Sequence, residues 1–564
     1  MSDESTKGLS RRRVLGAGIA AAVGAAMGVP NDAAAAQARG QAAAGAQAAA
    51  ADELVLVNGR IHTMDAKNTV ATTVTIRNGR FTAVGGAAPR AAAGRRIIDL
   101  RGRTVIPGII DNHNHIVAMG NRPGYHTPLE NATSIADVQA IIASRARTAP
   151  QGVWITTIGG FHRNHLVGSS EMPRLPTLAE LDKAAPNNPV FISEGFNGPS
   201  TTNSLGKKFF DSPIMPVPVG ADGGMAAGPQ ATGRALLVLR QTLLDSAERR
   251  RGAIDALNYG LSLGVTTHLD QGVFQATNTP NDGAAHEDNY TMQLPFVELH
   301  RENRLPARLR INYLHQDATP ELTTLRERVK NTIPFFGDDW IRTGGIGEFI
   351  GGPKAFVEAA KLLARSGWRA EVHSLSRNDF QQEIQDYETA HKESSIANLR
   401  WVVAHVPFIT EEWVNRLKAM GGGLSLTSWR YLAGTPDQNG PPFRMIVNNG
   451  IPAGMSSDGM QIAPMNPWLH MYYAVTGKNA RGVLINDGQQ ISREQVMKLY
   501  TASNGWFLRE ENQLGSIEVG KLGDLVVLNQ DYFNATAVPD EAIKRIRSVM
   551  TVVGGNIVLD TGGK

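Results

Sequence analysis

Residues of metal-ligand type follow short apolar runs that lie far apart in this chain of 564 residues. His113 and His115 end the run Val-Ile-Pro-Gly-Ile-Ile-Asp-Asn-His-Asn-His, His373 follows Arg-Ala-Glu-Val, His405 follows Trp-Val-Val-Ala, and Asp458 follows Ala-Gly-Met-Ser-Ser. A parallel α/β barrel carries its chemistry at the carboxyl ends of its strands. The pattern therefore predicts a (β/α)8 TIM-like barrel in which these side chains converge.

The middle of the chain supports a parallel sheet. Between residues 107 and 510, β-like runs alternate with helical patterns, as a parallel sheet requires. Residues 120–233 are long and rich in Pro and Gly for a single connection. We expect this stretch to form an insertion over the mouth of the barrel.

The segments before and after the barrel region have a different sequence pattern. Residues 53–106 and 511–564 contain short β-rich runs separated by turn signals such as Asn58-Gly59, Asn78-Gly79 and Gly554-Gly555. Asn-Gly between apolar runs favours a hairpin because both residues tolerate positive φ. These segments predict one small β-sandwich assembled from both ends of the chain.

The N-terminal segment has the features of a targeting sequence. Arg11, Arg12 and Arg13 precede an apolar stretch over residues 17–29, and an alanine-rich tract at 33–38 offers small residues to a peptidase. This resembles a twin-arginine signal peptide over residues 1–38. A membrane anchor is the alternative, but about 13 weakly apolar residues are fewer than the roughly 20 that span a bilayer.

If the targeting segment is cleaved, we expect a disordered leader over residues 39–52 and a periplasmic or secreted mature protein. The export machinery would be its partner during secretion, and a small molecule its substrate. The absence of cysteine excludes disulfides, thiolate metal sites and cysteine nucleophiles. A net charge of +4 without a dense Lys/Arg run gives no sign of nucleic-acid binding.

The spacing of His113 and His115 suits metal binding, because alternate residues of a strand lie on the same face. Four imidazoles and one or two carboxylates would hold one or two divalent ions, of which zinc is the expected one. Each of the other three candidate ligands could instead have a purely structural role. His373 and His405 could be hydrogen-bonded core histidines, and Asp458 could serve an Asx turn.

Two longer motifs carry a family resemblance. Residues 102–115, Gly-Arg-Thr-Val-Ile-Pro-Gly-Ile-Ile-Asp-Asn-His-Asn-His, and residues 515–528, Gly-Ser-Ile-Glu-Val-Gly-Lys-Leu-Gly-Asp-Leu-Val-Val-Leu, are similar to sequences of the metal-dependent amidohydrolase superfamily. With Leu-Gly-Val-Thr-Thr at 263–267, they resemble the branch that includes N-substituted formamide deformylase. The similarity covers nearly everything after the leader.

This resemblance implies roles for the five residues. His113 and His115 would bind the more buried ion, and His373 and His405 the more exposed one. Asp458 would contact the first ion and act as general base and acid. The implied reaction is hydrolysis of a non-peptide C–N bond in an amide, formamide or cyclic amide. Ester or lactone hydrolysis, ring deamination, or a binding protein without catalysis remain alternatives on the same fold.

One departure from the family concerns the bridge between two ions. Many members of the branch have a Lys, often carbamylated, where a gapless comparison places Gly347. Glu348 is the next residue, and a carboxylate can bridge two cations through its two oxygens. We expect Glu348 to be this bridge, turned inward by a glycine bulge. The alternative is an ion pair that leaves a mononuclear site.

Substrate contacts are harder to assign from the sequence. His162 and His165 lie in the insertion, His268 and Asp270 end a strand, and Arg430 follows another strand, so these five are candidate substrate or supporting residues. The branch commonly has a His before an Asn-Ser pair, and residues 194–204 lack it. Substrate preference is therefore not carried over, and the oligomeric state is open.

Overall fold

The structure is a computed structural model that describes residues 53–166, 172–195, 197–214, 216–273, 286, 290–349, 353–460 and 462–562. The expected signal peptide and leader, residues 1–52, lie outside the described residues. None of the described helices is both long and apolar enough to cross a membrane.

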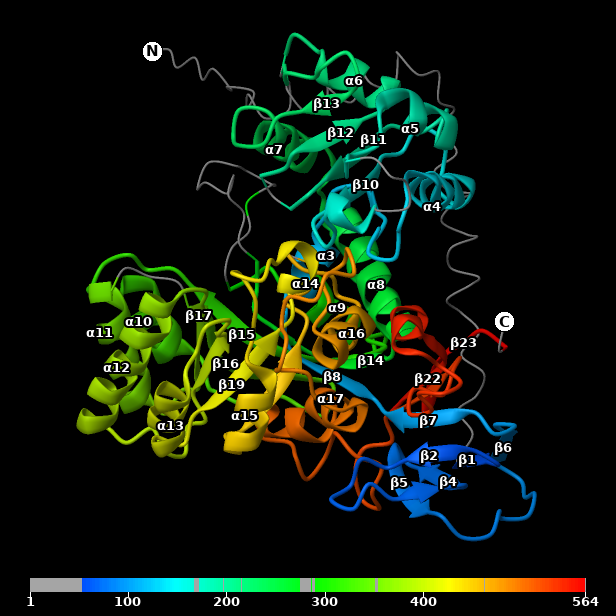
Figure 1. Ribbon diagram of the computed structural model, residues 1–564, viewed down its shortest axis with the longest axis vertical. Coiled ribbons are helices and arrows are strands. Elements are labelled where there is room, and N and C mark those ends of the chain that lie inside the picture. The colour runs from blue at the N-terminus through cyan, green and yellow to red at the C-terminus, as the bar shows by residue number, and fades with distance from the viewer. Residues whose placement is uncertain are drawn as a thin grey trace, which may run out of the picture. The chain divides into compact units, whose positions relative to one another are not determined.

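The central element is a sheet of eight parallel strands, and it confirms the predicted (β/α)8 barrel (Figure 1). Neighbouring strands pair in parallel throughout. In order around the sheet the strands are β8 (Ile109–Asn114), β14 (Val265–Asp270), β15 (Arg308–His315), β16 (Ile341–Phe349), β17 (Ala370–Ser374), β18 (Val402–His405), β19 (Gly423–Thr427) and β20 (Ala453–Ser456).

Backbone hydrogen bonds join the first barrel strand to the chain just after the last one. Asp458 N donates to the carbonyl of His113 at 2.9 Å, and His115 N donates to the carbonyl of Gly459 at 2.8 Å. These bonds connect residues that are far apart in sequence. They bring two predicted metal ligands and the predicted general base to one point.

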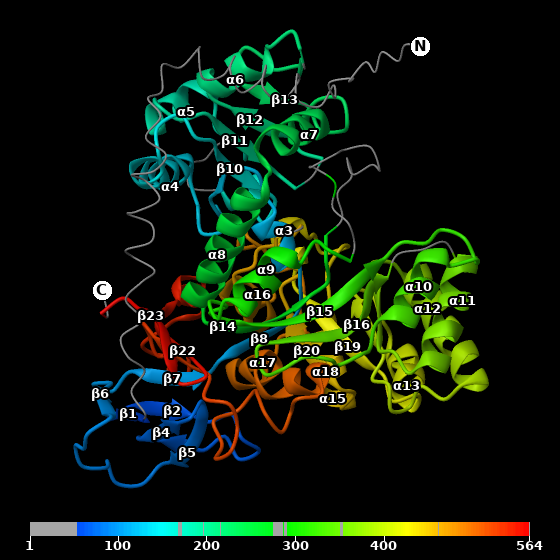
Figure 2. The same cartoon turned by 180° about the vertical axis from the view of Figure 1, so that it is seen from behind.

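Helices cover the outside of the barrel, as Figures 1 and 2 show for α10 to α13. They are α3 (Ile116–Gly120), α8 (Ser246–Leu263), α9 (Leu294–Arg301), α10 (Thr323–Asn331), α11 (Pro353–Ser366), α12 (Arg377–Glu393), α13 (Glu411–Ala419), α14 (Arg430–Ala433), α15 (Phe443–Asn449), α16 (Pro467–Thr476), α17 (Arg493–Tyr500) and α18 (Gly505–Leu508). Local sequence sets their ends. In α8, Asp245 accepts a hydrogen bond from Glu248 N, and Gly264 ends the helix at φ 91°.

Strands from both ends of the chain form the predicted sandwich (Figure 1, blue and red). One sheet contains β5 (Arg80–Val84), β4 (Val74–Arg77), β1 (Glu53–Val57) and β6 (Arg95–Asp99). The other contains β23 (Asn556–Asp560), β22 (Ser548–Val553), β21 (Leu525–Leu528), β7 (Thr104–Pro107), β2 (Arg60–His62) and β3 (Val70–Ala71). The antiparallel pairing of β21 with β7 joins the two ends.

The turn signals have two outcomes. Asn78-Gly79 lies between the antiparallel strands β4 and β5 with both residues at positive φ, so the hairpin prediction is confirmed. Asn58 also has positive φ, but β1 and β2 belong to different sheets. The Asn58-Gly59 hairpin prediction is wrong because the chain crosses there between the two sheets of the sandwich.

The long connection after α3 contains a five-stranded sheet of its own. Its elements are β9 (Tyr125–His126), β10 (Ile155–Ile158), β11 (Val190–Ser193), β12 (Ser200–Thr202) and β13 (Gly224–Met225), with helices α4 (Ile135–Thr148), α5 (Leu178–Ala184), α6 (Ser204–Phe210) and α7 (Thr232–Leu243). Glu130 accepts backbone hydrogen bonds from Met465 at 2.5 Å and Asn466 at 2.9 Å. The insertion therefore contacts the loop that follows β20, at the carboxyl end of the barrel.

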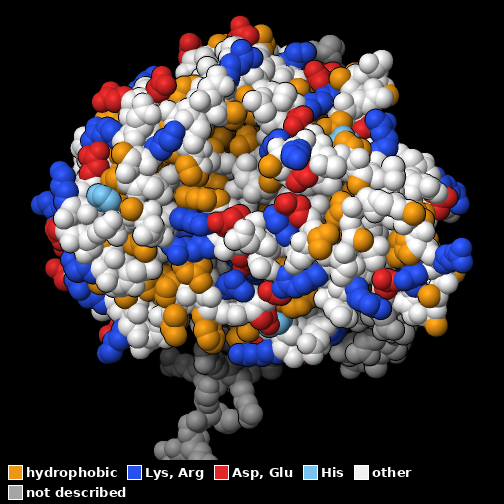
Figure 3. All heavy atoms as spheres, turned by 90° about the horizontal axis from the view of Figure 1, so that it is seen from below, with side chains coloured by type: hydrophobic (Ala, Val, Ile, Leu, Met, Phe, Trp, Pro, Cys, Tyr) orange, Lys and Arg blue, Asp and Glu red, His pale blue; other side chains and the backbone are white. Residues whose placement is uncertain are grey.

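A buried ion pair joins the sandwich segment to the barrel. Arg308, at the start of β15, donates from Nε and Nη2 to both carboxylate oxygens of Asp524, at 2.7 and 2.8 Å. Their side chains are 1% and 4% exposed. Away from this junction, Figure 3 shows acidic and basic side chains interspersed on the face seen from below.

We predict that Asp524→Asn destabilises the protein by about 3–5 kcal/mol, because it leaves the buried Arg308 cation without its carboxylate. The measurement is the urea dependence of unfolding, followed by fluorescence. Adding Arg308→Met should recover part of the loss, since it removes the unpaired charge. An unchanged urea midpoint for Asp524→Asn would show that the pair does not stabilise this junction.

Candidate metal centre

The six predicted metal ligands all lie at the carboxyl ends of barrel strands. His113 lies in β8 and His115 directly follows it, and the others are Glu348 in β16, His373 in β17, His405 at the end of β18 and Asp458 two residues after β20. The structure brings all six together. Placement at the same end of different strands of one barrel explains why residues so distant in sequence meet.

The six side chains form two groups that share Glu348. The inner group comprises His113, His115, Glu348 and Asp458, and the outer group comprises Glu348, His373 and His405. Within each group the potential ligand atoms lie within 4.8 Å of one another. His373 is 22% exposed, whereas the inner side chains are at most 3% exposed.

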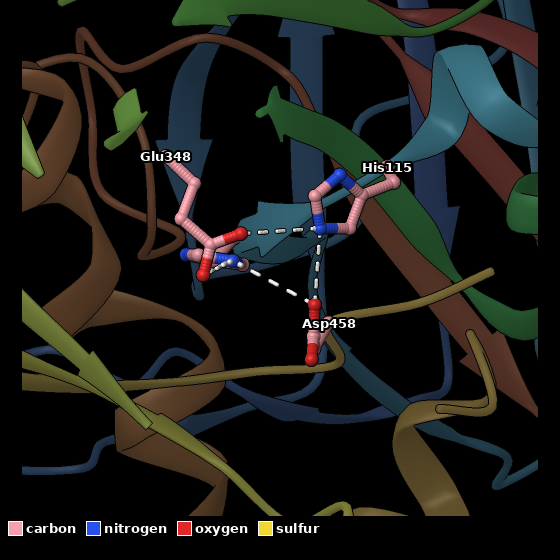
Figure 4. Close-up of side chains that lie close together, drawn as sticks. His115, Glu348 and Asp458 are labelled. Carbon is pink, nitrogen blue, oxygen red and sulfur yellow. Dashed lines mark hydrogen bonds and ion pairs between the residues drawn. The ribbon is translucent and has the colours of Figure 1, made fainter. Parts of the chain in front are cut away.

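In the inner group, imidazole nitrogens face carboxylate oxygens (Figure 4). His115 Nε2 is 3.1 Å from Asp458 Oδ1 and 3.7 Å from Glu348 Oε2. His113 Nε2 is 3.7 Å from Glu348 Oε1 and 3.7 Å from Asp458 Oδ1. These spacings place two nitrogens and two carboxylates around one small volume.

In the outer group, two imidazoles approach Oε1 of Glu348. His405 Nε2 is 2.6 Å from Glu348 Oε1 and 2.9 Å from His373 Nδ1. His373 Nδ1 also contacts Glu348 Oε1. Glu348 Oε2 faces His115, and Oε1 faces both outer imidazoles as well as His113 at 3.7 Å, so this one carboxylate contacts both groups, as a bridging carboxylate would.

An irregularity in β16 accompanies the inward orientation of Glu348. The pairing of β16 with β17 shifts register between Ile346 and Phe349, so Glu348 does not follow the regular alternation of the strand. Its side chain is 1% exposed. The local sequence Gly-Gly-Ile-Gly-Glu supplies the small residues that such an irregularity tolerates.

Two buried polar atoms of the inner group fit a bound cation. Within the described part of the chain, His113 Nε2 and Asp458 Oδ2 have no hydrogen-bond partner. Buried polar atoms are rarely left in this state because desolvation is costly. A divalent ion would complete both, and the imidazole and carboxylate donors suit zinc-like metals.

Electrostatics keep both carboxylates ionised. Burial alone would raise the pKa of Glu348, but the facing imidazoles, His373 foremost, hold it well below its ordinary value. Burial likewise opposes ionisation of Asp458, and the attraction of His405 and His115 lowers its pKa overall. Ionised carboxylates are the form that binds a metal.

The backbone is unusual at two of the six positions. His405 has φ 69° and Asp458 has φ 54°, both in the left-handed region that residues with a Cβ rarely adopt. Such conformations persist where surrounding structure enforces them, and they cluster at functional sites. Here they accompany the turns that direct both side chains into the cluster.

Comparisons with known proteins agree with this geometry. The model of the amidohydrolase family matches residues 96–559. This chain belongs to the amidohydrolase family. The N-substituted formamide deformylase of Arthrobacter pascens is 24% identical over 85% of this chain and 94% of its own length.

Solved structures support the fold of this amidohydrolase. An uncharacterized metal-dependent hydrolase from Pyrococcus horikoshii OT3 has a TM-score of 0.58 at 17% identity, covering 86% of this chain and 98% of that one. Atrazine chlorohydrolase from Arthrobacter aurescens TC1, complexed with zinc, has a TM-score of 0.51 at 15% identity, covering 90% and 95%.

The candidate substrate residues of the insertion and of α14 lie outside the two metal groups. His162 is partly exposed, with Nε2 4.0 Å from a Glu194 carboxylate oxygen. His165 is buried with its ring 5.4 Å from that of Tyr431, and burial lowers its pKa to about 3. The Arg430 guanidinium lies 4.0 Å from the centre of the Trp429 ring.

The two candidates of β14 contact the chain around His115. His268 Nδ1 is 3.0 Å from Asn114 Nδ2, and its ring packs against Gly260 of α8. Asp270 accepts hydrogen bonds from Val117 N at 3.1 Å and from Gln293 Nε2 at 2.9 Å. Both therefore support the segment that carries the His-x-His pair.

Two further polar residues contact the ligands of this amidohydrolase and were missed by sequence reasoning. Glu371 in β17 forms a hydrogen bond with His113, and Thr427 in β19 forms one with His405. Glu371 is two residues before His373, so strand alternation puts both side chains on one face of β17. The two-residue spacing from His373 was the sequence signal that could have identified Glu371. Thr427 ends an apolar run, but threonine is common in strands and gave no specific signal.

We predict that Glu348→Gln lowers metal content from two ions per chain to one or none, because a neutral amide bridges cations poorly. Elemental analysis after dialysis is the measurement. Glu358→Gln, at a partly exposed position that pairs with Lys361, is the control and should keep full metal content. Two ions retained at unchanged affinity in Glu348→Gln would favour the ion-pair alternative.

Proposed function

We propose that this protein is an exported zinc-dependent amidohydrolase that hydrolyses a non-peptide C–N bond in a small amide, formamide or cyclic amide. The observation that carries the proposal is the convergence of four imidazoles and two carboxylates at the carboxyl end of the barrel. The similarity to N-substituted formamide deformylase supports the amide direction. The N-terminal sequence supports export.

The residues divide the work between binding and proton transfer. His113, His115, Glu348 and Asp458 would hold one ion, and His373 and His405 with Glu348 the other. When bound, such an ion lowers the pKa of water towards about 7 and polarises a carbonyl oxygen. Burial of five of these side chains, all but His373, strengthens the electrostatic interactions there.

Asp458 is suited to move the proton. Its Oδ1 lies against His115 Nε2, while its buried Oδ2 has no hydrogen-bond partner among the described residues. In the proposed reaction the attacking water adds to the carbonyl carbon and transfers a proton to Asp458. The C–N bond then breaks as Asp458 returns that proton to the leaving nitrogen. No covalent bond to the protein is needed.

Other reactions share this machinery. Attack on a ring carbon would release ammonia from an amidine, and a 5-methylthioadenosine/S-adenosylhomocysteine deaminase from Caldanaerobacter subterraneus is 25% identical over 32% of this chain. Ester and lactone hydrolysis need the same steps. A non-catalytic binding protein would have no use for a complete donor set with an ionised base.

A substrate screen tests the proposal directly. Purified protein is analysed for metals and assayed on N-acyl amines, formamides, hydantoins, lactones and aminated rings. Metal-dependent release of an amine or ring-opened product supports the amidohydrolase. If the protein holds stoichiometric metal but cleaves only esters or lactones, the proposed reaction is wrong and the protein is an ester or lactone hydrolase. If it holds no metal and hydrolyses nothing, the alternative of a non-catalytic binding protein is favoured.

We predict that Asp458→Asn lowers kcat by about 10²–10⁴-fold because it removes the proton acceptor. The measurements are steady-state kinetics on the substrate found in the screen and metal content. Most metal should remain, since the other five ligands are intact. Asp437→Asn, on an exposed loop, is the control. Unchanged turnover in Asp458→Asn would remove this residue from the proton transfer.

We predict that replacing Arg11, Arg12 and Arg13 together by Lys retains the uncleaved precursor in the cytoplasm, because the twin-arginine machinery requires an arginine pair. Cell fractionation with immunoblotting measures it. A change of Lys7→Arg outside the triplet should leave export intact. Normal secretion of the triple variant would contradict the targeting assignment.

A further inference from the structure

A charged network lies inside the barrel next to the metal groups. Glu371 in β17 and Arg369, directly before this strand, are fully buried, as is Asn312 in β15. Barrel interiors are normally filled by layers of apolar side chains. Charged groups at this place are costly unless they are paired, so their pairing partners indicate what they do.

Glu371 orients the ring of His113. Glu371 Oε1 is 2.6 Å from His113 Nδ1. Glu371 therefore occupies the Nδ1 side of the ring. Nε2 is then the atom that faces Glu348 and Asp458, and it has no hydrogen bond in the described part of the chain. A histidine that binds a metal through one nitrogen commonly donates from the other to a carboxylate.

Further contacts hold Glu371 in this orientation. Arg369 Nη2 donates to Glu371 Oε2 at 2.7 Å, and Asn312 Nδ2 donates to the same oxygen at 3.2 Å. Gly347 provides the space: a Cβ there would lie 2.8 Å from Glu371 Cβ and 2.9 Å from its carbonyl oxygen. Any larger residue at 347 would displace the strand segment that carries Glu371.

The corresponding nitrogens of His115 and His405 meet neutral groups. His115 Nδ1 is 2.7 Å from the carbonyl oxygen of Gly272, and His405 Nδ1 is 2.8 Å from the hydroxyl of Thr427. A carboxylate partner fixes an imidazole and raises its basicity more than a neutral partner does. The inner group therefore has the better supported nitrogen ligand, and it is also more deeply buried than His373.

We propose that Glu371 is a positioning residue that makes the inner group the tighter of two ion sites. The protein then keeps an inner ion under conditions that remove the outer one. This inference rests on the metal dependence proposed above. Glu371 then determines which of the two sites fills first, because Thr427 supports the outer site only weakly.

The test compares two variants that act on opposite sites. Zinc retained against graded chelator, measured by elemental analysis, should fall in two steps for the unchanged protein. Glu371→Gln should weaken the tighter step about 10–100-fold. Thr427→Val, which removes the hydroxyl partner of His405, should weaken the looser step. Equal effects of both variants on both steps would overturn the proposal.

A His373→Ala background identifies which ion is measured, because it removes an outer ligand and should leave one ion. In that background Glu371→Gln should weaken the remaining ion about 10–100-fold, and Thr427→Val should leave it unchanged. An unweakened ion in Glu371→Gln/His373→Ala overturns the proposal. Cobalt substitution adds a spectroscopic readout, since the absorption bands report the ligand field of the remaining ion.

Loss of folding is separated from loss of metal by a second variant. Glu371→Gln leaves Arg369 without its carboxylate, whereas Glu371→Asp keeps the charge and withdraws it from His113 by one methylene. Thermal unfolding of chelated protein shows whether each variant folds. If Glu371→Gln does not fold, the affinity of Glu371→Asp for the inner ion decides between the proposal and its failure. Absence of any ion in the unchanged protein would refute the proposed function, whereas two ions with affinities indifferent to Glu371 would refute this inference alone.

Discussion

Two backbone hydrogen bonds, Asp458 N to the His113 carbonyl and His115 N to the Gly459 carbonyl, tie the first barrel strand to the loop after the last one. His115 Nε2 and Asp458 Oδ1 then meet across 343 positions of sequence. Because these contacts are made only when the ring of strands closes, the inner group cannot assemble in part of the chain. Folding of the whole barrel is therefore the condition for assembling the inner group that would hold an ion.

The predictable part of the site is the part encoded by strand ends. An apolar run followed by His or Asp is a local signal, and parallel strands of one barrel end on the same side, so the convergence of six residues could be expected without knowing their distances. Glu348 was predicted because it follows Gly347, the position where the family resemblance places a Lys. Its orientation depends on a register shift between β16 and β17, which is a property of the pair of strands and not of either sequence alone.

The parts that could not be predicted depend on tertiary context. Asn58-Gly59 has the local chemistry of a hairpin, yet the strands it connects pair with other partners in separate sheets. His268 ends a strand as the metal ligands do, but its ring packs against Gly260 of α8. Which face of a strand points into the barrel is decided by pairing and packing, so the same residue type at a strand end can bind metal or support the fold.

Gly347 and Glu348 together account for the departure from the bridging Lys that the family resemblance implies. A side chain at 347 would collide with Glu371, the residue that orients His113. The proposed bridging carboxylate comes from the next position, where the pairing of β16 with β17 shifts register. In the proposed site Glu348 supplies both oxygens directly, whereas a lysine needs carbamylation to provide them. The buried Glu371 and the unmodified bridge are then two consequences of one packing constraint at β16 and β17.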